Sequence, residues 1–159
     1  MERARRKREL FDIIFSRAYR AGFSTGLKQK NKYPEIKELK KIILYTRRIK
    51  PDLIIAVGGG SVIDYAKMAN ILNPEKNLTK QIINSDYGKI KKFTKLLAIP
   101  TTAGTGAEVT SNAVIYIGKI KFSVESELLK PNYFIIIPCP DAVVKISLLS
   151  FFVCKFINL

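Results

Sequence analysis

The stretch "IIAVGGGSVIDYAK", residues 54–67, decides how this chain folds. Its apolar start belongs to "DLIIAV", residues 52–57, which has the β-branched composition of a strand buried on both faces of a parallel sheet. The run enters glycine at Gly58, and a helical segment follows and stops at Asn73-Pro74. We therefore predict a buried strand, a tight glycine loop and a helix over residues 61–72.

The three glycines form a loop that suits an anion. Gly58, Gly59 and Gly60 lack the Cβ atoms that would keep a phosphate away from the backbone. The first N–H groups of the helix that begins near Ser61 have no partner within the helix, and the helix dipole adds about half a positive charge there. Together these features favour a phosphate site. Ser61 and Asp64 also fit the S-x-x-[DE] capping box, in which Asp64 would tie down the helix start.

A second loop repeats this arrangement. "KLLAIP", residues 95–100, reads as another buried strand, and "TTAGTGAE" follows it with hydroxyls from Thr101, Thr102 and Thr105. Thr105 and Glu108 fit a second capping box, so a flexible loop before a capped helix is the alternative interpretation. Because α/β proteins bind ligands beyond the carboxyl ends of their strands, two such loops on adjacent parallel strands would line one crevice.

The alternation of helices, strands and glycine-rich loops predicts an α/β fold: a Rossmann-like parallel sheet with flanking helices, plus a β-hairpin. Gly118 stands at the first position of a two-residue turn between "NAVIYI" and "IKFSVES", which is typical of a hairpin. The other segments that we expect are a helix over residues 35–49, an irregular polar segment over 75–92 and a strand over 133–138.

The formal net charge of +15 is concentrated near the N-terminus. Residues 1–50 carry 16 Lys and Arg against 5 Asp and Glu, led by "RARRKR" at residues 3–8. Residues 2–19 have apolar side chains near helical spacing, which predicts a basic amphipathic helix. Such a run can bind phosphate backbones or anionic membranes, but a solvated helix start is the simpler interpretation, and no nucleic-acid fold signature accompanies it. The charged N-terminus favours a cytoplasmic protein.

Together the two loop motifs resemble a known family. "IIAVGGGSVIDYAK" followed by "LLAIPTTAGTGAEVTSNAVIY" resembles the iron-containing (group III) alcohol dehydrogenases, which share the dehydroquinate synthase-like fold. The resemblance covers roughly residues 35–138, and "AVIYIGKIKFS" is similar to the phosphonoacetaldehyde reductase-like branch. It implies a Rossmann-like domain that binds NAD or NADP, followed by a helical domain with a divalent, iron-type metal. It also implies hydride transfer between nicotinamide and a small alcohol or aldehyde.

The resemblance implies a set of cofactor-binding positions in this chain. Residues 58–61 would contact the pyrophosphate, the threonines would line the sugar and nicotinamide portions, and Lys121 would lie near the nicotinamide ribose. An outward-pointing hairpin lysine is the alternative for Lys121. The full set is Gly58, Gly59, Gly60, Ser61, Asp64, Thr101, Thr102, Thr105 and Lys121.

The family's metal chemistry is missing from this sequence. The resemblance implies one Asp and three His as metal ligands, whereas this chain contains no His. We therefore predict no catalytic residue and no metal ligand, and we expect a truncated dehydrogenase that lacks the metal-binding helical domain. Its expected parts are a basic segment over residues 1–34, a dinucleotide-binding domain over 35–141 and an apolar tail over 142–159.

Two other functions stay open from the sequence. The first is a non-catalytic module that binds a dinucleotide or phosphate through the same loops. The second is a basic adaptor that binds nucleic acid or an anionic membrane through residues 3–8. The main interpretation expects no specific nucleic-acid partner. It also expects no membrane, because the apolar tail over residues 146–159 is shorter than the roughly 20 residues that span a bilayer; a truncated tail anchor is the alternative interpretation of this tail.

Overall fold

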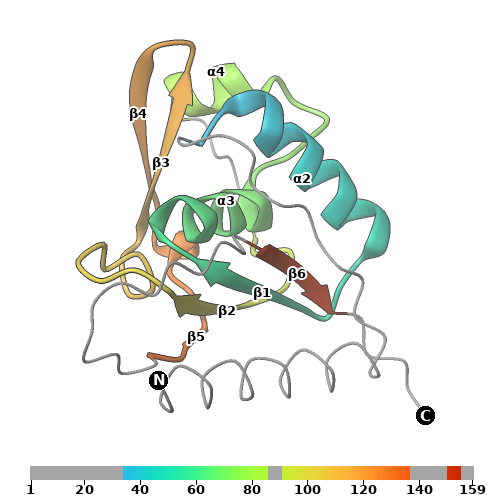
Figure 1. Ribbon diagram of the computed structural model, residues 1–159. Coiled ribbons are helices and arrows are strands. Elements are labelled where there is room, and N and C mark those ends of the chain that lie inside the picture. Colours follow the sequence, from blue (N-terminus) through green and yellow to red (C-terminus); the bar gives the residue numbers. More distant parts are fainter. Residues whose placement is uncertain (1–33, 86–90, 137–149, 155–159) are drawn as a thin grey trace.

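The computed structural model describes residues 34–85, 91–136 and 150–154 of the chain (Figure 1). The helix expected over residues 2–19 lies outside these ranges. The described elements, in chain order, are α2 (Ile36–Ile49), β1 (Leu53–Gly58), α3 (Gly60–Ile71), α4 (Leu78–Ile83), β2 (Lys95–Pro100), β3 (Asn112–Ile117), β4 (Ile120–Glu125), the 3-10 turn η1 (Glu127–Leu129), β5 (Tyr133–Phe134) and β6 (Ser150–Cys154).

The main sheet has four strands in the order β5-β2-β1-β6. β1 and β2 are parallel, with Leu53 opposite Lys95 and Gly58 opposite Pro100, and β5 continues the parallel pairing beyond β2. Parallel neighbours need a long crossover, and α3 supplies it here. The predicted parallel α/β sheet is therefore confirmed. The sequence predicted no strand in the apolar tail, where β6 pairs antiparallel with β1.

Helix α3 covers one face of this sheet (Figure 1). Under it, alternate residues of the two central strands are almost completely buried: Ile54 and Ala56 in β1, Leu96 and Ala98 in β2. This alternation follows from the two-residue side-chain period of a strand. The N-terminal end of α3 is thereby held at the edge of the sheet where β1 and β2 end.

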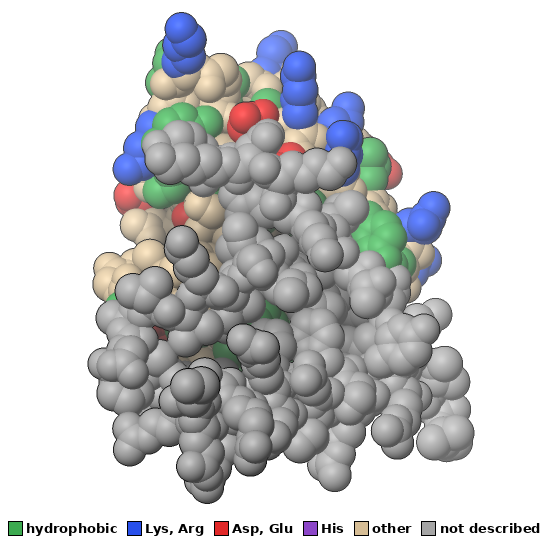
Figure 2. Space-filling view, viewed as in Figure 1, with side chains coloured by type: hydrophobic (Ala, Val, Ile, Leu, Met, Phe, Trp, Pro, Cys, Tyr) green, Lys and Arg blue, Asp and Glu red, His purple; other side chains and the backbone are tan. Residues whose placement is uncertain are grey.

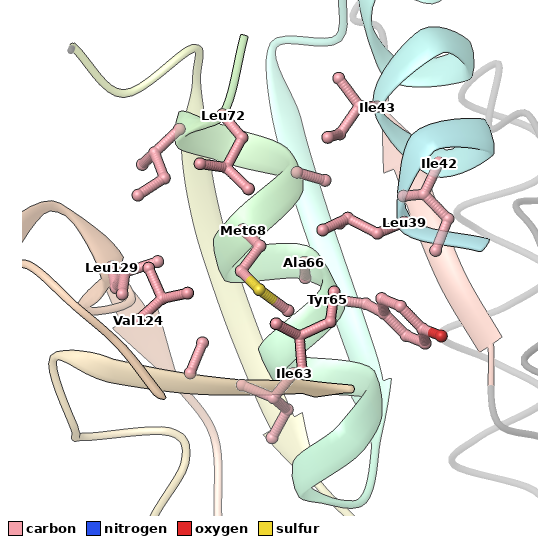
Figure 3. Close-up of a cluster of buried hydrophobic side chains, with 14 of the residues drawn as sticks. Leu39, Ile42, Ile43, Ile63, Tyr65, Ala66, Met68, Leu72, Val124 and Leu129 are labelled. Carbon is pink, nitrogen blue, oxygen red and sulfur yellow. The ribbon is translucent and has the colours of Figure 1, made fainter. Parts of the chain in front are cut away.

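The remaining sides of α3 are also enclosed. Figure 3 shows Met68 of α3 between two groups of side chains. Leu39 and Ile43 of α2 lie on one side, and Val124 of β4 and Leu129 of η1 lie on the other. All five side chains are fully buried. Each contributes about 1.5–3 kcal/mol through its removal from water. Helix α3 is thus a central, mostly buried element and not a surface helix.

The β3–β4 hairpin confirms the predicted turn. Ile117 pairs with Ile120 across a two-residue connection, and Gly118 adopts a φ of 64°. A positive φ at the first loop position is what glycine permits in such a turn. The hairpin stands beside α3 and buries Ala113 and Val124 against the core.

Two of the expected segments differ from the structure. The polar stretch over residues 75–92 contains helix α4, whose start is capped by the Asn77 side chain accepting a hydrogen bond from the Lys80 N–H at 3.1 Å. Asparagine is a preferred N-cap, so this helix had a readable signal. The strand predicted over residues 133–138 is shorter, with only Tyr133 and Phe134 in strand conformation among its described residues.

The described residues form no single basic patch in the view of Figure 2. On this face the described Lys and Arg side chains are scattered over the upper part of the molecule. Residues 3–8, the proposed adaptor run, lie outside the described ranges. Among the helices of the described segments, none combines the length and apolar character needed to cross a membrane.

Candidate functional site

The two glycine-bearing loops meet at one edge of the sheet. The Thr101 N–H donates a hydrogen bond to the Gly58 carbonyl oxygen at 2.9 Å. A Cβ atom placed on Gly59 would lie 3.1 Å from Thr102 Oγ1, and one on Gly60 would lie 3.2 Å from Thr105 Cγ2. The loops are therefore in contact, as their positions on adjacent parallel strands predict.

The three glycines serve different purposes. A Cβ atom on Gly58 would lie only 2.7 Å from Val62 Cγ2, so Gly58 is required by the packing of α3 on β1. Gly59 has a φ of −76° and a ψ of −177°, which any residue adopts without strain. The missing side chains of Gly59 and Gly60 instead let Thr102 and Thr105 of the second loop come close to the start of α3.

The N-terminus of α3 presents free donors to this place. The Gly59 carbonyl oxygen accepts hydrogen bonds from the N–H groups of Val62 at 3.0 Å and Ile63 at 3.3 Å. Helix geometry then leaves the N–H groups of Gly60 and Ser61 without an acceptor inside the helix. No acidic residue stands in the first turn of α3, so nothing there opposes the positive end of the helix dipole. These features suit an anion.

The predicted capping box at this helix is wrong. Gly59 is the N-cap and makes no side-chain capping bond, which places Ser61 inside the helix. Asp64 Oδ2 instead accepts a hydrogen bond at 3.1 Å from the Val114 N–H of β3. The carboxylate reaches a strand 50 residues away, so it fastens the hairpin to α3 rather than closing its own helix.

The pKa of the Asp64 carboxyl group is shifted by its surroundings. Burial raises the pKa of its carboxyl group from 3.8 to about 6, although the Val114 N–H and the charges of Lys67 and Lys121 act in the opposite direction. Lys121 is exposed on β4, as an outward-pointing hairpin lysine would be, yet its charge acts on Asp64. Among the positively charged side chains that the structure describes, Lys67 and Lys121 are thus the two that act on the Asp64 carboxyl group.

The second loop is an irregular turn built on glycines and not the start of a helix. Gly104 and Gly106 have φ angles of 86° and 60°, in the left-handed region that favours glycine. The Gly106 carbonyl oxygen accepts hydrogen bonds from the N–H groups of Val109 and Thr110, which closes a single turn. The capping box predicted for Thr105 and Glu108 is therefore wrong, because no helix follows.

The threonines of this loop differ in exposure. Thr101 is half-buried, whereas Thr102 and Thr105 are exposed beside the glycines. In the part of the chain that the structure describes, the buried Oε2 atom of Glu108 has no hydrogen-bond partner. The loop therefore brings the Thr102 hydroxyl and the Thr105 side chain close to the helix start, while the Glu108 carboxylate oxygen is buried.

Sequence reasoning did not single out Lys67, although it is a central polar group of this region. Its side chain is 0% exposed. The Lys67 ammonium group donates hydrogen bonds to the carbonyl oxygen of Thr110 at 2.9 Å, to Thr110 Oγ1 at 3.0 Å and to the carbonyl oxygen of Asn112 at 2.9 Å. The sequence feature that could have identified Lys67 is its place on the largely apolar helix that follows the glycines, one turn beyond Asp64.

The residues do not fit a metal ion. The chain has no His, and within the described ranges no three side chains of His, Cys, Asp or Glu converge. The divalent ion that the family resemblance implies therefore has no ligand set here, and no chemical step of this chain is assigned to one.

Comparison with known proteins identifies the wider group. The model of a family described as iron-containing alcohol dehydrogenase matches residues 2–138. The match extends further toward the N-terminus than the motif resemblance over residues 35–138, so it includes most of the basic segment. An alcohol dehydrogenase from Thermococcus barophilus is 36% identical over 111 residues, which cover 66% of this chain and 29% of that protein.

Solved structures show the same fold. The NADH-dependent butanol dehydrogenase A of Thermotoga maritima has a TM-score of 0.59 at 29% identity, over 67% of this chain and 27% of that one. The sulfoacetaldehyde reductase of Bifidobacterium kashiwanohense, solved in complex with NAD⁺, has a TM-score of 0.59 at 26% identity, over 67% of this chain and 29% of that one. The chain thus spans less than a third of the length of these relatives.

Proposed function

The chain belongs to the iron-containing alcohol dehydrogenase family, and from this we propose that its two glycine-bearing loops bind the diphosphate of a nicotinamide dinucleotide, NAD or NADP. The observation that carries the proposal is the contact between the start of α3 at Gly59 and Gly60 and the threonines at 102 and 105. The NAD⁺ complex of one structural relative and the NADH dependence of another support the choice of ligand.

Each residue of the predicted set has a role in this proposal. The N–H groups of Gly60 and Ser61 donate to the diphosphate, and Gly59, which has no side chain, lets Thr102 lie close to the same place. Gly58 acts indirectly, by letting α3 pack on β1. The hydroxyl groups of the second loop line the sugars and the nicotinamide, and Lys121 of the hairpin and Asp64 of α3 flank them. The hydroxyl-bearing residues are Thr101, Thr102 and Thr105.

The bound dinucleotide would supply a hydride donor or acceptor. The residues of this chain would bind and orient it, and the relatives' alcohol and aldehyde chemistry is proposed only for a protein that also provides metal ligands. Tyr133, Phe134, Ile135 and Ile136 at the β5 edge are each about half exposed. An exposed apolar row of this kind marks a contact surface, and we assign it to a further domain of such a protein.

A second candidate function is a non-catalytic module that binds the dinucleotide. It rests on the same loops and on the absence of His from the sequence. It differs from the first candidate in one result: adding a separately produced metal-binding domain of a relative would leave it inactive, whereas a split dehydrogenase would gain NADH oxidation with an aldehyde.

The binding itself is tested with Ser61→Glu in the full chain. A glutamate at the second position of α3 stabilises the helix N-terminus by about 0.3–1 kcal/mol but repels a diphosphate. We expect NADH to bind the unchanged chain in a fluorescence titration and to bind the variant at least tenfold more weakly, about 1.4 kcal/mol. The melting temperature should not fall.

The matched control is Thr79→Glu, because Thr79 is the second residue of α4 and is also half-buried. It adds the same charge at the same position of another helix and should leave NADH affinity unchanged. Absence of binding of both NADH and NADPH to the unchanged chain would refute the proposal. Equal affinities of the unchanged chain and of Ser61→Glu for NADH would refute the placement of the diphosphate at the start of α3.

A further inference from the structure

Lys67 is a fully buried ammonium group in a helix whose neighbouring side chains are mostly apolar. Burial lowers the pKa of this group, and the charges of Asp64 and Glu108 act against that decrease. A buried charge is costly unless it is fully hydrogen-bonded and compensated. Lys67 meets both conditions, since its three hydrogens face three oxygen acceptors.

The acceptors of Lys67 lie at one point of the chain. Thr110 ends the second loop, and Asn112 is the first residue of β3. The ammonium group therefore fixes the place where the loop passes into the hairpin. The other end of the loop is fixed by the hydrogen bond from the Thr101 N–H to the Gly58 carbonyl oxygen.

Between these two fixed points the loop reaches the core only through Ala107, which is 5% exposed, and the part beside the start of α3 has no such support. Residues 102–105 are exposed, and they include the threonines that contact Gly59 and Gly60. The position of those hydroxyl groups therefore depends on the anchors that flank them: the Thr101 hydrogen bond on one side, and Ala107 with the Lys67 contacts on the other. Since Lys67 and the N-terminal donors belong to the same helix, α3 sets both sides of the site.

We propose that Lys67 is a positioning residue of the dinucleotide site, which holds the threonine loop at a fixed distance from the open N–H groups of α3. The inference rests on the proposed function for its ligand but not for its geometry. An apolar side chain of the same length could fill the same space, as buried charges elsewhere are replaced without loss of stability. Such a side chain would not hold Thr110 and Asn112.

The test compares Lys67→Met with the unchanged full chain by amide hydrogen exchange and NADH titration. We expect the hydrogen-bonded N–H groups of Thr101, Val109 and Thr110 to exchange at least tenfold faster in the variant. The amides of β1 should keep their protection, and the NADH dissociation constant should rise at least tenfold. Lys80→Met, on exposed Lys80 of α4, removes the same charge and should change neither measurement.

Other results overturn the inference. Uniformly faster exchange in the loop and in β1 would show a loss of global stability instead of a positioning role. Unchanged loop exchange would show that Lys67 does not hold the loop. If Lys67→Met does not fold, Thr110→Val removes only the hydroxyl acceptor, and loop-selective exchange in that variant supports the inference while uniform exchange opposes it. If the unchanged chain binds no NADH, the proposed function fails, and loop exchange alone still decides the role of Lys67.

Discussion

The Thr101 N–H and the Gly58 carbonyl oxygen, 2.9 Å apart, join the two loops where their strands end. This bond continues the parallel ladder of β1 and β2 by one step, beyond the pair of Gly58 and Pro100. The positions of the groups that the loops present to a ligand are therefore set by the sheet. The strand end at Gly58 is consequently sensitive to any change in how α3 packs on it.

Gly58→Ala should destabilise the fold. The added Cβ atom would lie 2.7 Å from Val62 Cγ2, and the β-branched Val62 side chain cannot turn away freely inside a helix. Overpacking of this kind costs about 1–3 kcal/mol, measurable by urea unfolding. Val62→Ala in the same chain should recover part of the loss. If the double variant were no more stable than the sum of the single changes predicts, the clash would not be the cause.

Asp64 should make stability depend on pH. Because burial raises its pKa from 3.8 to about 6, the folded chain binds more protons than the unfolded chain between these values. The free energy of unfolding should then fall as pH rises from about 4 to about 6, by about 2–3 kcal/mol from this group. Above that window the contribution stays constant.

The check on Asp64 is Asp64→Asn, which keeps an oxygen acceptor for the Val114 N–H and does not ionise. Urea unfolding at several pH values should show the unchanged chain losing stability relative to the variant as pH rises through the window. A difference between the two proteins that stays constant with pH would contradict the assignment.

Arg47 should stabilise the C-terminal end of α3. Its Nη2 atom donates a hydrogen bond to the Leu72 carbonyl oxygen at 3.1 Å, and its guanidinium carbon lies 3.9 Å from the centroid of the Phe93 ring. A cation at a helix C-terminus and a cation–π contact each contribute about 0.5–2 kcal/mol. Arg47→Met should therefore lower the free energy of unfolding by about 1–3 kcal/mol.

The matched control for Arg47 is Arg48→Met, since Arg48 is exposed and its guanidinium carbon lies 5.8 Å from the Tyr45 ring centroid. It should change stability by less than about 0.5 kcal/mol. Phe93→Leu combined with Arg47→Met forms a double-mutant cycle. A coupling energy of zero in that cycle would remove the cation–π contribution.

The parts that the sequence predicted well are those with a local cause. The composition of residues 95–100 and the glycine at 58 defined the ends of both central strands, and Gly118 defined the hairpin. Adjacent positions on a parallel sheet then predicted that the loops meet. The family was readable for the same reason, because its motifs are these two loops.

The parts that were missed depend on contacts distant in sequence. Asp64 has the spacing of a capping residue, but its partner is Val114, 50 positions away. The acceptors of Lys67 lie 43 and 45 positions away. A local sequence pattern does not predict which of several distant partners a polar side chain will bind in the folded chain, so these roles could be seen only in the structure. Asn77 is a different case, since its capping signal was present in the sequence.

The antiparallel pairing of β6 with β1 has a consequence for synthesis. During translation β1 and β2 leave the ribosome long before residues 150–154, so the edge of β1 that β6 pairs with stays open while the rest of the sheet is already available. An open strand edge is a template for association with other chains. The interval between the two strands is therefore the period in which a nascent copy of this protein would need protection by a chaperone.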